Sequence, residues 1–225
     1  ELLRRLCRIE GLVWIRILYC YPEEITQELI QVIREEEKIC HYVDIPVQSG
    51  SDEVLRRMGR RTDSGQIRGM IKRLREAVPD ICIRTTLIAG FPGESLEDHE
   101  QTLAFVDEME FDRLGVFAYS AEEDTPAAEL PDQIPEQEKE RRRDEIMELQ
   151  KEIAFDTAHR MGGRRMKAMI EGKVADEDVY VARTFRDAPE VDGYLFIRAD
   201  TELMSGDFVE ALITGSNEYD LLGEI

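Results

Sequence analysis

The chain has 225 residues, of which 42% are hydrophobic, so it can bury a core and fill one large and one small domain. Its 49 acidic and 29 basic residues give a formal charge of −20, which repels a phosphate backbone and argues against nucleic acid as a main partner. No run of about 18 apolar residues is present, and the first residues lack the apolar core of a signal peptide, so we expect no membrane span and a cytoplasmic location.

Two interpretations of the acidic charge remain open. It can steer a basic protein surface toward the chain, or it can simply keep the chain in solution. The chain also opens without a methionine inside a predicted helix, with Leu2, Leu3, Leu6 and Ile9 on one face, which predicts an excised fragment.

From residue 12 to about 120, β-rich runs alternate with helical patterns. Strands are predicted over residues 13–19, 40–47, 81–90 and 114–120, with helices between them at 25–33, 51–58, 67–78 and from Ser95 onward. Ser95 and Asp98 form a capping box for the last of these helices. Four βα repeats of this kind predict a parallel sheet, either an α/β barrel or an open doubly wound sheet.

The C-terminal part has a different pattern. Residues 121–135 contain three prolines and predict a loop, and a charged helix follows over residues 136–159, with a narrow apolar stripe of Ile146, Leu149 and Ile153. Short strands are then predicted at 166–171, 179–185, 194–197, 208–213 and 219–222, which is typical of a small β-barrel. We therefore expect one domain over residues 1–161 and a second over 162–225.

Ligands of parallel α/β folds bind at the carboxyl ends of the strands, so the residues there are the candidate site. The segment DIPVQSGS (44–51) places Gln48 where a ligand would lie, while Ser51 is expected to cap a helix. The segment GFPGES (90–95) has glycines that let a ligand approach the backbone, and Glu94 could accept a hydrogen bond from an ammonium group. A tight turn without function remains an equal alternative for this segment.

Two further strand ends are candidates. Of Phe117 and Tyr119 in FAYS, one is expected to face the mouth of the barrel, where it could stack on an adenine, with core packing as the alternative. Arg84 is a charge in an apolar strand and needs a partner, for which Glu94 and a substrate carboxylate are the candidates.

Cysteine and histidine offer no metal site. The four cysteines, Cys7, Cys20, Cys40 and Cys82, lie far apart in sequence and are interpreted as single buried thiols. The three histidines, His41, His99 and His159, have no second ligand nearby and are interpreted as structural.

Four blocks in succession resemble the methylthiotransferases, which are radical S-adenosylmethionine (SAM) enzymes that end in a TRAM β-barrel. The blocks are HYVDIPVQSGSDEVLRRMGRR (41–61), IRTTLIAGFPGES (83–95), FDRLGVFAYSAEEDTPAAELPDQIP (111–135) and RTFRDAPEVDGYLFI (183–197). LYCYPEE, VFAYSAEEDTPAAELPDQ and RDAPEVDG are more similar to the RimO branch, whereas VQSGS is more similar to the tRNA-modifying MiaB branch. The resemblance implies the C-terminal half of a (β/α) TIM-type radical SAM barrel followed by a TRAM barrel.

The resemblance also implies a reaction. RimO-type enzymes add a methylthio group to the β-carbon of an aspartate in ribosomal protein S-twelve, with SAM as methyl donor and radical source and with two [4Fe-4S] clusters. One cluster is held by a CxxxCxxC motif and the other by an N-terminal domain, and neither set of cysteines has a counterpart here. We therefore expect this segment to be inactive alone, and no catalytic residue is assigned.

By position, the resemblance assigns a set of residues to the wall of the SAM site. They are Gln48, Ser49, Arg84, Gly90, Phe91, Pro92, Gly93, Glu94, Phe117 and Tyr119. The loop is expected near the methionyl or ribose part, and the aromatic strand near the adenine.

The C-terminal domain bears on the substrate. Residues 160–225 contain 8 basic and 14 acidic residues, a balance of −6, whereas a barrel that grips tRNA should be basic. The acidic barrel is therefore expected to bind the basic ribosomal protein. The alternatives are a tRNA-modifying enzyme of the MiaB type and a non-catalytic module that binds a ribosomal partner.

Overall fold

The computed structural model describes residues 1–225, which form two compact units, Glu1–Lys151 and Glu152–Ile225. The predicted domain boundary between residues 161 and 162 stays a prediction. None of the helices is long and apolar enough to cross a membrane.

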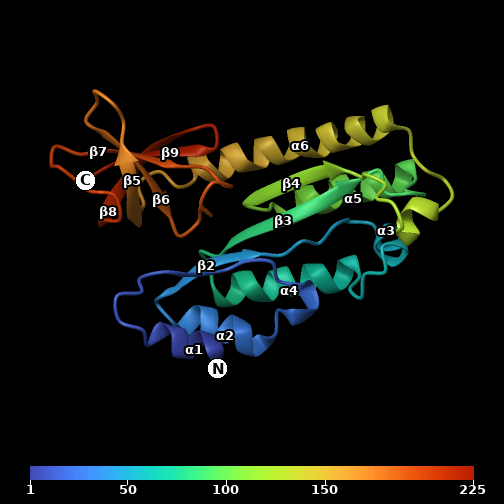
Figure 1. Cartoon of the computed structure of the whole chain (residues 1–225), viewed down its shortest axis with the longest axis horizontal. Helices are drawn as coiled ribbons and strands as arrows, with labels where there is room; N and C mark the ends of the chain where they lie inside the picture. The colour runs from blue at the N-terminus through green and yellow to red at the C-terminus, as the bar shows by residue number, and fades with distance from the viewer. The chain divides into compact units, whose positions relative to one another are not determined.

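The first unit contains a parallel sheet with the strand order β1-β2-β3-β4 (Figure 1). Its strands are β1 (Ile15–Ile17), β2 (Ile39–Asp44), β3 (Cys82–Ala89) and β4 (Arg113–Ala118). Its helices are α1 (Leu2–Cys7), α2 (Gln27–Glu35), α3 (Asp52–Arg57), α4 (Ser64–Ala77) and α5 (Leu96–Met109), with short 3₁₀ turns at η1 (Pro22–Glu24) and η2 (Pro126–Glu129). The predicted series of βα repeats is confirmed.

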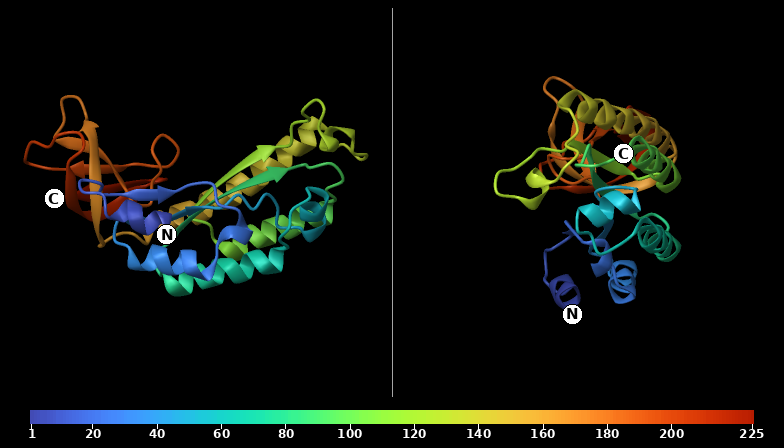
Figure 2. Two further views of the ribbon diagram at one scale, coloured as in Figure 1. Left: turned by 60° about the horizontal axis from the view of Figure 1, so that its bottom comes forward. Right: turned by 90° about the vertical axis from the view of Figure 1, so that its right-hand side faces the viewer.

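One face of the sheet is covered and the other is more open. In β3, Ile83, Thr85 and Leu87 are fully buried, while Arg84 and Thr86 between them are only partly buried. Side chains alternate between the two faces of a strand, so the buried set defines the face that packs on helices. Figure 2 shows α2, α4 and α5 lying along this side of the strands.

Local signals explain where the helices begin. Ser95 accepts a hydrogen bond from the amide of Asp98, and the Asp98 side chain accepts one from the amide of Ser95, so the predicted capping box is confirmed. Ser51 caps α3 as expected, through a bond from the amide of Val54. These caps fix the points at which the chain leaves the ends of β2 and β3.

A long helix, α6 (Glu136–His159), follows the proline-rich loop and has the predicted bounds. Its buried positions are partly the expected ones, Ile146 and Ile153, whereas Leu149 is only partly buried. The same face also buries Lys139 and Arg142, each 7% exposed. The buried face of α6 is therefore polar at its N-terminal end, which the apolar stripe alone did not predict.

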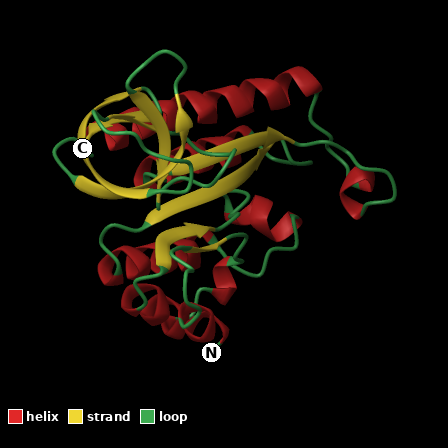
Figure 3. Ribbon diagram, turned by 60° about the vertical axis from the view of Figure 1, so that its left-hand side comes forward, coloured by secondary structure: helices red, strands yellow, loops and turns green.

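The second unit contains a closed barrel with the strand order β5-β6-β7-β9-β8 (Figure 3). The strands are β5 (Arg165–Lys173), β6 (Val179–Thr184), β7 (Leu195–Arg198), β8 (Phe208–Asn217) and β9 (Asp220–Glu224). Inward-facing Ile170, Tyr180, Leu195, Ile197 and Ile213 form its core. The five predicted strands and their closure into a small barrel are confirmed.

The cysteines differ in part from expectation. Cys40 and Cys82 are buried in β2 and β3, as predicted, but Cys7 and Cys20 are only partly buried. Both of these lie outside the strands of the sheet, Cys7 in the short helix α1 and Cys20 after β1, where less of the core covers them. The prediction of burial was wrong for these two.

Candidate functional site

The segments that follow β2, β3 and β4 meet at one end of the sheet. Gln48 bridges to β3: its amide donates to the carbonyl of Thr86 and its carbonyl accepts from the amide of Ile88, both at 2.9 Å. The amide of Tyr119 donates to the carbonyl of Ala89 at 2.8 Å. Gly90 is the next residue after Ala89, so Gln48, Gly90 and Tyr119 lie at the same end of the sheet, where the strands have their carboxyl ends.

Gln48 adopts a conformation that is unusual for its residue type. Its φ is +76°, in the left-handed region that costs a non-glycine residue about 1–2 kcal/mol. Its side-chain Oε1 is buried and has no hydrogen-bond partner. A strained backbone and an unsatisfied acceptor at one residue are typical of a functional position.

A cavity of about 420 Å³ opens at this end of the sheet. Its lining is mainly apolar with a few polar groups: Gln48, Arg57, Met58, Arg60, Ile88, Phe91, Thr125, Pro126, Ala127 and Leu130. This volume and this mixture are typical of sites that hold a small organic ligand. Of the predicted site residues, the structure brings Gln48 and Phe91 to the wall of the cavity.

Tyr119 packs behind this wall. Its ring meets the ring of Phe91 edge to face, with the ring centroids 5.2 Å apart, and Lys139 Nζ lies 5.3 Å from its ring centroid. Tyr119 is 7% exposed, and its buried hydroxyl has no hydrogen-bond partner. Phe117, by contrast, is 63% exposed and lies beside Ile88 of β3. Phe117 is therefore the one of the two aromatic residues whose face is open to a ligand.

The residues 90–94, GFPGE, form the loop between β3 and α5, called the 90–94 loop below. Gly90 and Gly93 have φ angles of +74° and +78°, which glycine adopts without strain. A methyl group on Gly90 would lie 2.4 Å from Cγ of Lys139 and 3.1 Å from its Cα, so the loop packs directly against α6. The loop therefore has little freedom to accept larger residues.

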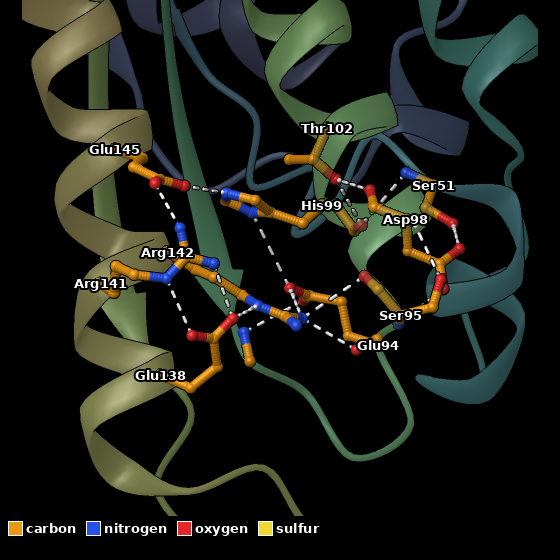
Figure 4. Close-up of polar contacts among 12 residues, drawn as sticks. Ser51, Glu94, Ser95, Asp98, His99, Thr102, Glu138, Arg141, Arg142 and Glu145 are labelled. Carbon is orange, nitrogen blue, oxygen red and sulfur yellow. Dashed lines mark hydrogen bonds and ion pairs between the residues drawn. The ribbon is translucent and has the colours of Figure 1, made fainter.

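Glu94 closes the loop through buried contacts (Figure 4). Its Oε2 accepts a bond of 3.0 Å from the amide of Gly90, and its Oε1 accepts one of 2.8 Å from Nη1 of Arg142. Arg84, which the sequence offered as a partner for Glu94, instead lies in the first half of β3, in register with Asp44 and Arg113. The pairing of Glu94 with Arg84 was wrong, because a helix distant in sequence supplies the partner.

A second group of polar contacts surrounds this pair. Nε2 of His99 lies 2.7 Å from Oε2 of Glu145, and its Nδ1 lies 4.0 Å from Oε1 of Glu94. The hydrogen bond from His99 lowers the pKa of Glu145, and Arg141 pairs with the same carboxylate. His99 is thus a buried structural residue that links α5 to α6, as Figure 4 shows.

Asp98 joins the segment after β2 to the start of α5. Its Oδ1 accepts from the hydroxyl of Ser51 at 2.5 Å, and its Oδ2 accepts from the hydroxyl of Ser95 at 2.6 Å. Burial alone raises the pKa of Asp98, but the bonds from Ser51 and Ser95 outweigh it, so the net pKa lies below the ordinary value. Asp98 is therefore held as a carboxylate between the two segments.

The remaining predicted residues have mixed positions. Ser49 is buried and its hydroxyl lies 3.3 Å from that of Thr102 on α5, so it faces the helix layer. Pro92 is buried in the 90–94 loop. Neither Ser49 nor Arg84 lines the cavity described above.

Several residues at this end of the sheet were not predicted from the sequence. Arg57 and Arg60 line the cavity, and Lys139 and Arg142 pack on the loop. Arg142 had one signal, because it continues the helical spacing of Ile146 backward along α6. Long charged residues of a charged helix are ordinarily exposed to solvent, so this spacing alone does not predict a buried arginine.

The chain offers no ligand set for a metal or an iron–sulfur cluster, because no group of three or more His, Cys, Asp or Glu side chains converges. The four cysteines are separate free thiols. The residues do fit the nucleoside part of a cofactor, since an apolar cavity beside an unpartnered amide oxygen suits a heteroaromatic base.

Two family models match the chain. The model described as the Radical SAM superfamily matches residues 1–106, and the model described as the TRAM domain matches residues 163–225. Among solved structures, coproporphyrinogen III oxidase from Escherichia coli, a radical SAM enzyme, aligns with a TM-score of 0.52 at 20% identity over 76% of this chain and 46% of its own. That likeness supports the fold and nothing beyond it.

Curated relatives match the chain from end to end. The protein named "Ribosomal protein uS12 methylthiotransferase RimO" from Lachnoclostridium phytofermentans is 56% identical over 99% of this chain, and the protein of the same name from Desulfitobacterium hafniense is 46% identical over 100%. The aligned region makes up 51% and 50% of these two relatives. The chain therefore spans about half the length of the curated relatives that it matches.

Proposed function

Because the chain belongs to the RimO-like radical SAM methylthiotransferases with a TRAM domain, we propose that it is part of an enzyme that transfers a methylthio group to ribosomal protein uS12. Its parallel sheet contributes one wall of the SAM site, and its C-terminal barrel binds the substrate protein. The acceptor is the β-carbon of an aspartate side chain. The observation that carries the proposal is the convergence of three strand ends on one cavity.

The proposed cofactor wall is built from the residues at these strand ends. Ile88 and Phe91 offer apolar surface to the adenine, and Phe117 offers an exposed ring at the edge of the sheet. The side-chain Oε1 of Gln48 is an unsatisfied acceptor for an amino group of the ligand. SAM supplies the methyl group and the radical, while these residues bind and orient it.

Two predicted residues, Ser49 and Arg84, do not line the cavity, and we propose supporting roles for them. Ser49 supports the segment that carries Gln48, because its hydroxyl packs on Thr102. Arg84 lies on the same face of β3 as Ile88, toward the amino end of the strand, where it could meet a substrate carboxylate.

The substrate assignment is supported by the charge of the barrel. Most of its acidic residues are exposed, among them Asp176, Glu177, Asp178, Glu190, Asp200, Glu202, Glu210, Glu218 and Glu224. Ribosomal proteins are basic, so this surface attracts them and repels phosphate backbones. The barrel is the proposed docking surface for uS12.

One observation favours a second candidate, a tRNA substrate. Four of the eight basic residues from 160 to 225 are exposed within eight positions: Arg160, Arg164, Arg165 and Lys167. Such a local cluster can hold phosphates even on an acidic domain. A gel shift with unmodified tRNA at moderate salt, with Arg164→Gln and Arg165→Gln as variants, separates the two candidates.

The chain itself supplies no cluster ligands, so we propose that it does not cleave SAM alone. Two clusters are proposed for the complete protein. The test is reconstitution of this chain with iron and sulfide, followed by a reductant and SAM, in parallel with the complete protein and uS12. The proposal expects a methylthio mass increase on uS12 only with the complete protein. Release of 5′-deoxyadenosine by the chain alone, or a complete protein that modifies tRNA and leaves uS12 unchanged, contradicts it.

A further inference from the structure

We propose that Arg142 of α6 is a positioning residue for the cofactor site, which holds the 90–94 loop in the conformation that presents Phe91 to the cavity. The inference rests on the proposed function, because it assigns the loop to the wall that binds SAM. Arg142 itself does not line the cavity, so it acts through Glu94.

The guanidinium of Arg142 contacts the C-terminal end of the 90–94 loop. Nη1 donates to both the carbonyl and the Oε1 of Glu94 at 2.8 Å, and to the carbonyl of Ser95 at 3.4 Å. Nε donates to Glu138 on its own helix at 2.8 Å. The fork of a guanidinium can serve these acceptors together, whereas an ammonium group is a single point of charge.

Glu94 passes this restraint to the start of the loop. Its second oxygen accepts from the amide of Gly90, where the chain leaves β3. The amide of Gly93 donates to the carbonyl of Asp132 at 2.9 Å, which ties the middle of the loop to the proline-rich segment. Only Phe91 and Pro92 lie between these anchors, so the anchors decide where the ring of Phe91 points.

The burial of the pair makes the restraint strong. The side chains of Arg142 and Glu94 are 8% and 4% exposed. The groups that face them are Glu138 from α6 and His99 from α5, whose Nδ1 is 4.0 Å from Glu94. Without Arg142, Glu94 keeps only His99 as an ion-pair partner, and His99 is charged only when it is protonated. A buried carboxylate without a cationic partner is strongly disfavoured. We therefore expect loss of Arg142 to release the loop.

The experiment uses the complete, cluster-loaded protein with three variants. Arg142→Met removes the guanidinium and keeps the aliphatic stem, and Arg142→Lys keeps the charge but not the fork. Arg143→Met is the matched control, because Arg143 is the neighbouring arginine of α6 and pairs only with Asp144. Hydrogen exchange of the amides of Gly90 and Gly93, measured without SAM, reports on the loop, and the SAM dissociation constant and KM report on the site.

In Arg142→Met, the loop amides are expected to exchange about tenfold faster or more, because at least one charge-assisted hydrogen bond that holds the loop closed is lost. The KM for SAM is expected to rise about tenfold with a smaller change in kcat. Arg142→Lys should lie between wild type and Arg142→Met, and Arg143→Met should match wild type.

Three results overturn the inference. Unchanged loop exchange in Arg142→Met shows that Arg142 does not hold the loop, and faster exchange with an unchanged SAM dissociation constant shows that the loop does not shape the cofactor site. Equal loss of protection throughout the first unit means that Arg142 acts only on global stability, which also overturns it. Failure of the proposed function looks different, because wild type itself then leaves uS12 unmodified.

Discussion

The hydroxyl of Ser51 donates to Oδ1 of Asp98 at 2.5 Å, and this bond ties the segment after β2 to the first turn of α5. The same Ser51 oxygen accepts from the amide of Val54 and caps α3. One side chain thus fixes the positions of two of the segments that form the candidate site.

Replacing Ser51 should cost more than the loss of an ordinary helix cap. Ser51→Ala removes the cap and leaves the buried Asp98 carboxylate with one donor fewer, so we expect a loss of about 2–3 kcal/mol in the free energy of unfolding. Thr26→Ala removes the exposed cap of α2 and should cost about 1 kcal/mol. Urea unfolding of both variants makes the comparison. Equal losses would show that the bond to Asp98 adds nothing.

Gly90 should be intolerant of a side chain for two separate reasons. Gly90→Ala places a methyl group at a φ of +74° and also against Lys139, so we expect a loss of about 3 kcal/mol from strain and overpacking. Gly59 has a similar φ of +70° with no atom within 4 Å of the added carbon, so Gly59→Ala isolates the strain alone. The difference between the two losses in urea unfolding measures how closely α6 packs on the loop. No difference would contradict that packing.

Replacing Gln48 with glycine should weaken SAM binding and leave the stability of the fold almost unchanged. Gln48→Gly relieves the left-handed backbone and removes the unsatisfied amide oxygen, so the free energy of unfolding should change by less than about 1 kcal/mol. SAM affinity of the complete protein should fall about tenfold, as expected for a lost hydrogen bond to the ligand. Glu110→Gly, at a φ of 41° in the end of α5, is the control and should leave SAM affinity unchanged. Unchanged affinity in Gln48→Gly would remove this residue from the proposed site.

Acid should weaken α6 itself through Glu138, because its partners Arg141 and Arg142 lie on the same helix. Hydrogen bonds from Arg141 and Arg142 lower the pKa of Glu138 to about 2, below its ordinary value of 4.5. Because the folded-state pKa is depressed, the stabilisation is fully present above pH 4.5 and is lost as the pH falls toward 2. The ¹³C shift of its carboxyl group, followed by NMR, should titrate in that low range. In Arg141→Gln the midpoint should move up toward 4.5, and an unmoved midpoint contradicts the assigned cause.

Local patterns were sufficient to predict most of the fold. The capping box of Ser95 and Asp98 and the bounds of α6 follow from residues close together in sequence, and the structure has both. The apolar run at residues 81–90 predicted the strand β3, and the structure adds that Arg84 lies on its less buried face. Such signals depend on neighbours along one helix or strand, which a single sequence records.

The contacts that complete the site could not be predicted in this way. The pairing of Glu94 with Arg142 joins a loop to a helix that is distant in sequence. Glutamate and arginine are each ordinarily found on the exposed surface, so neither residue alone predicts the pair. The left-handed backbone of Gln48 has no signature in its residue type. Phe117 and Tyr119 were recognised as a pair, but only their packing decides that Tyr119 is the buried one.

We propose that the segments after β2, β3 and β4 form one wall of a SAM site. Photo-crosslinking of the complete protein with an azidoadenosine analogue of SAM, followed by peptide mapping, tests it most directly. We expect label on the peptides that contain Gln48, Phe91 or Phe117, and we expect excess SAM to suppress it. Label that excess SAM suppresses and that falls only on other peptides would contradict it.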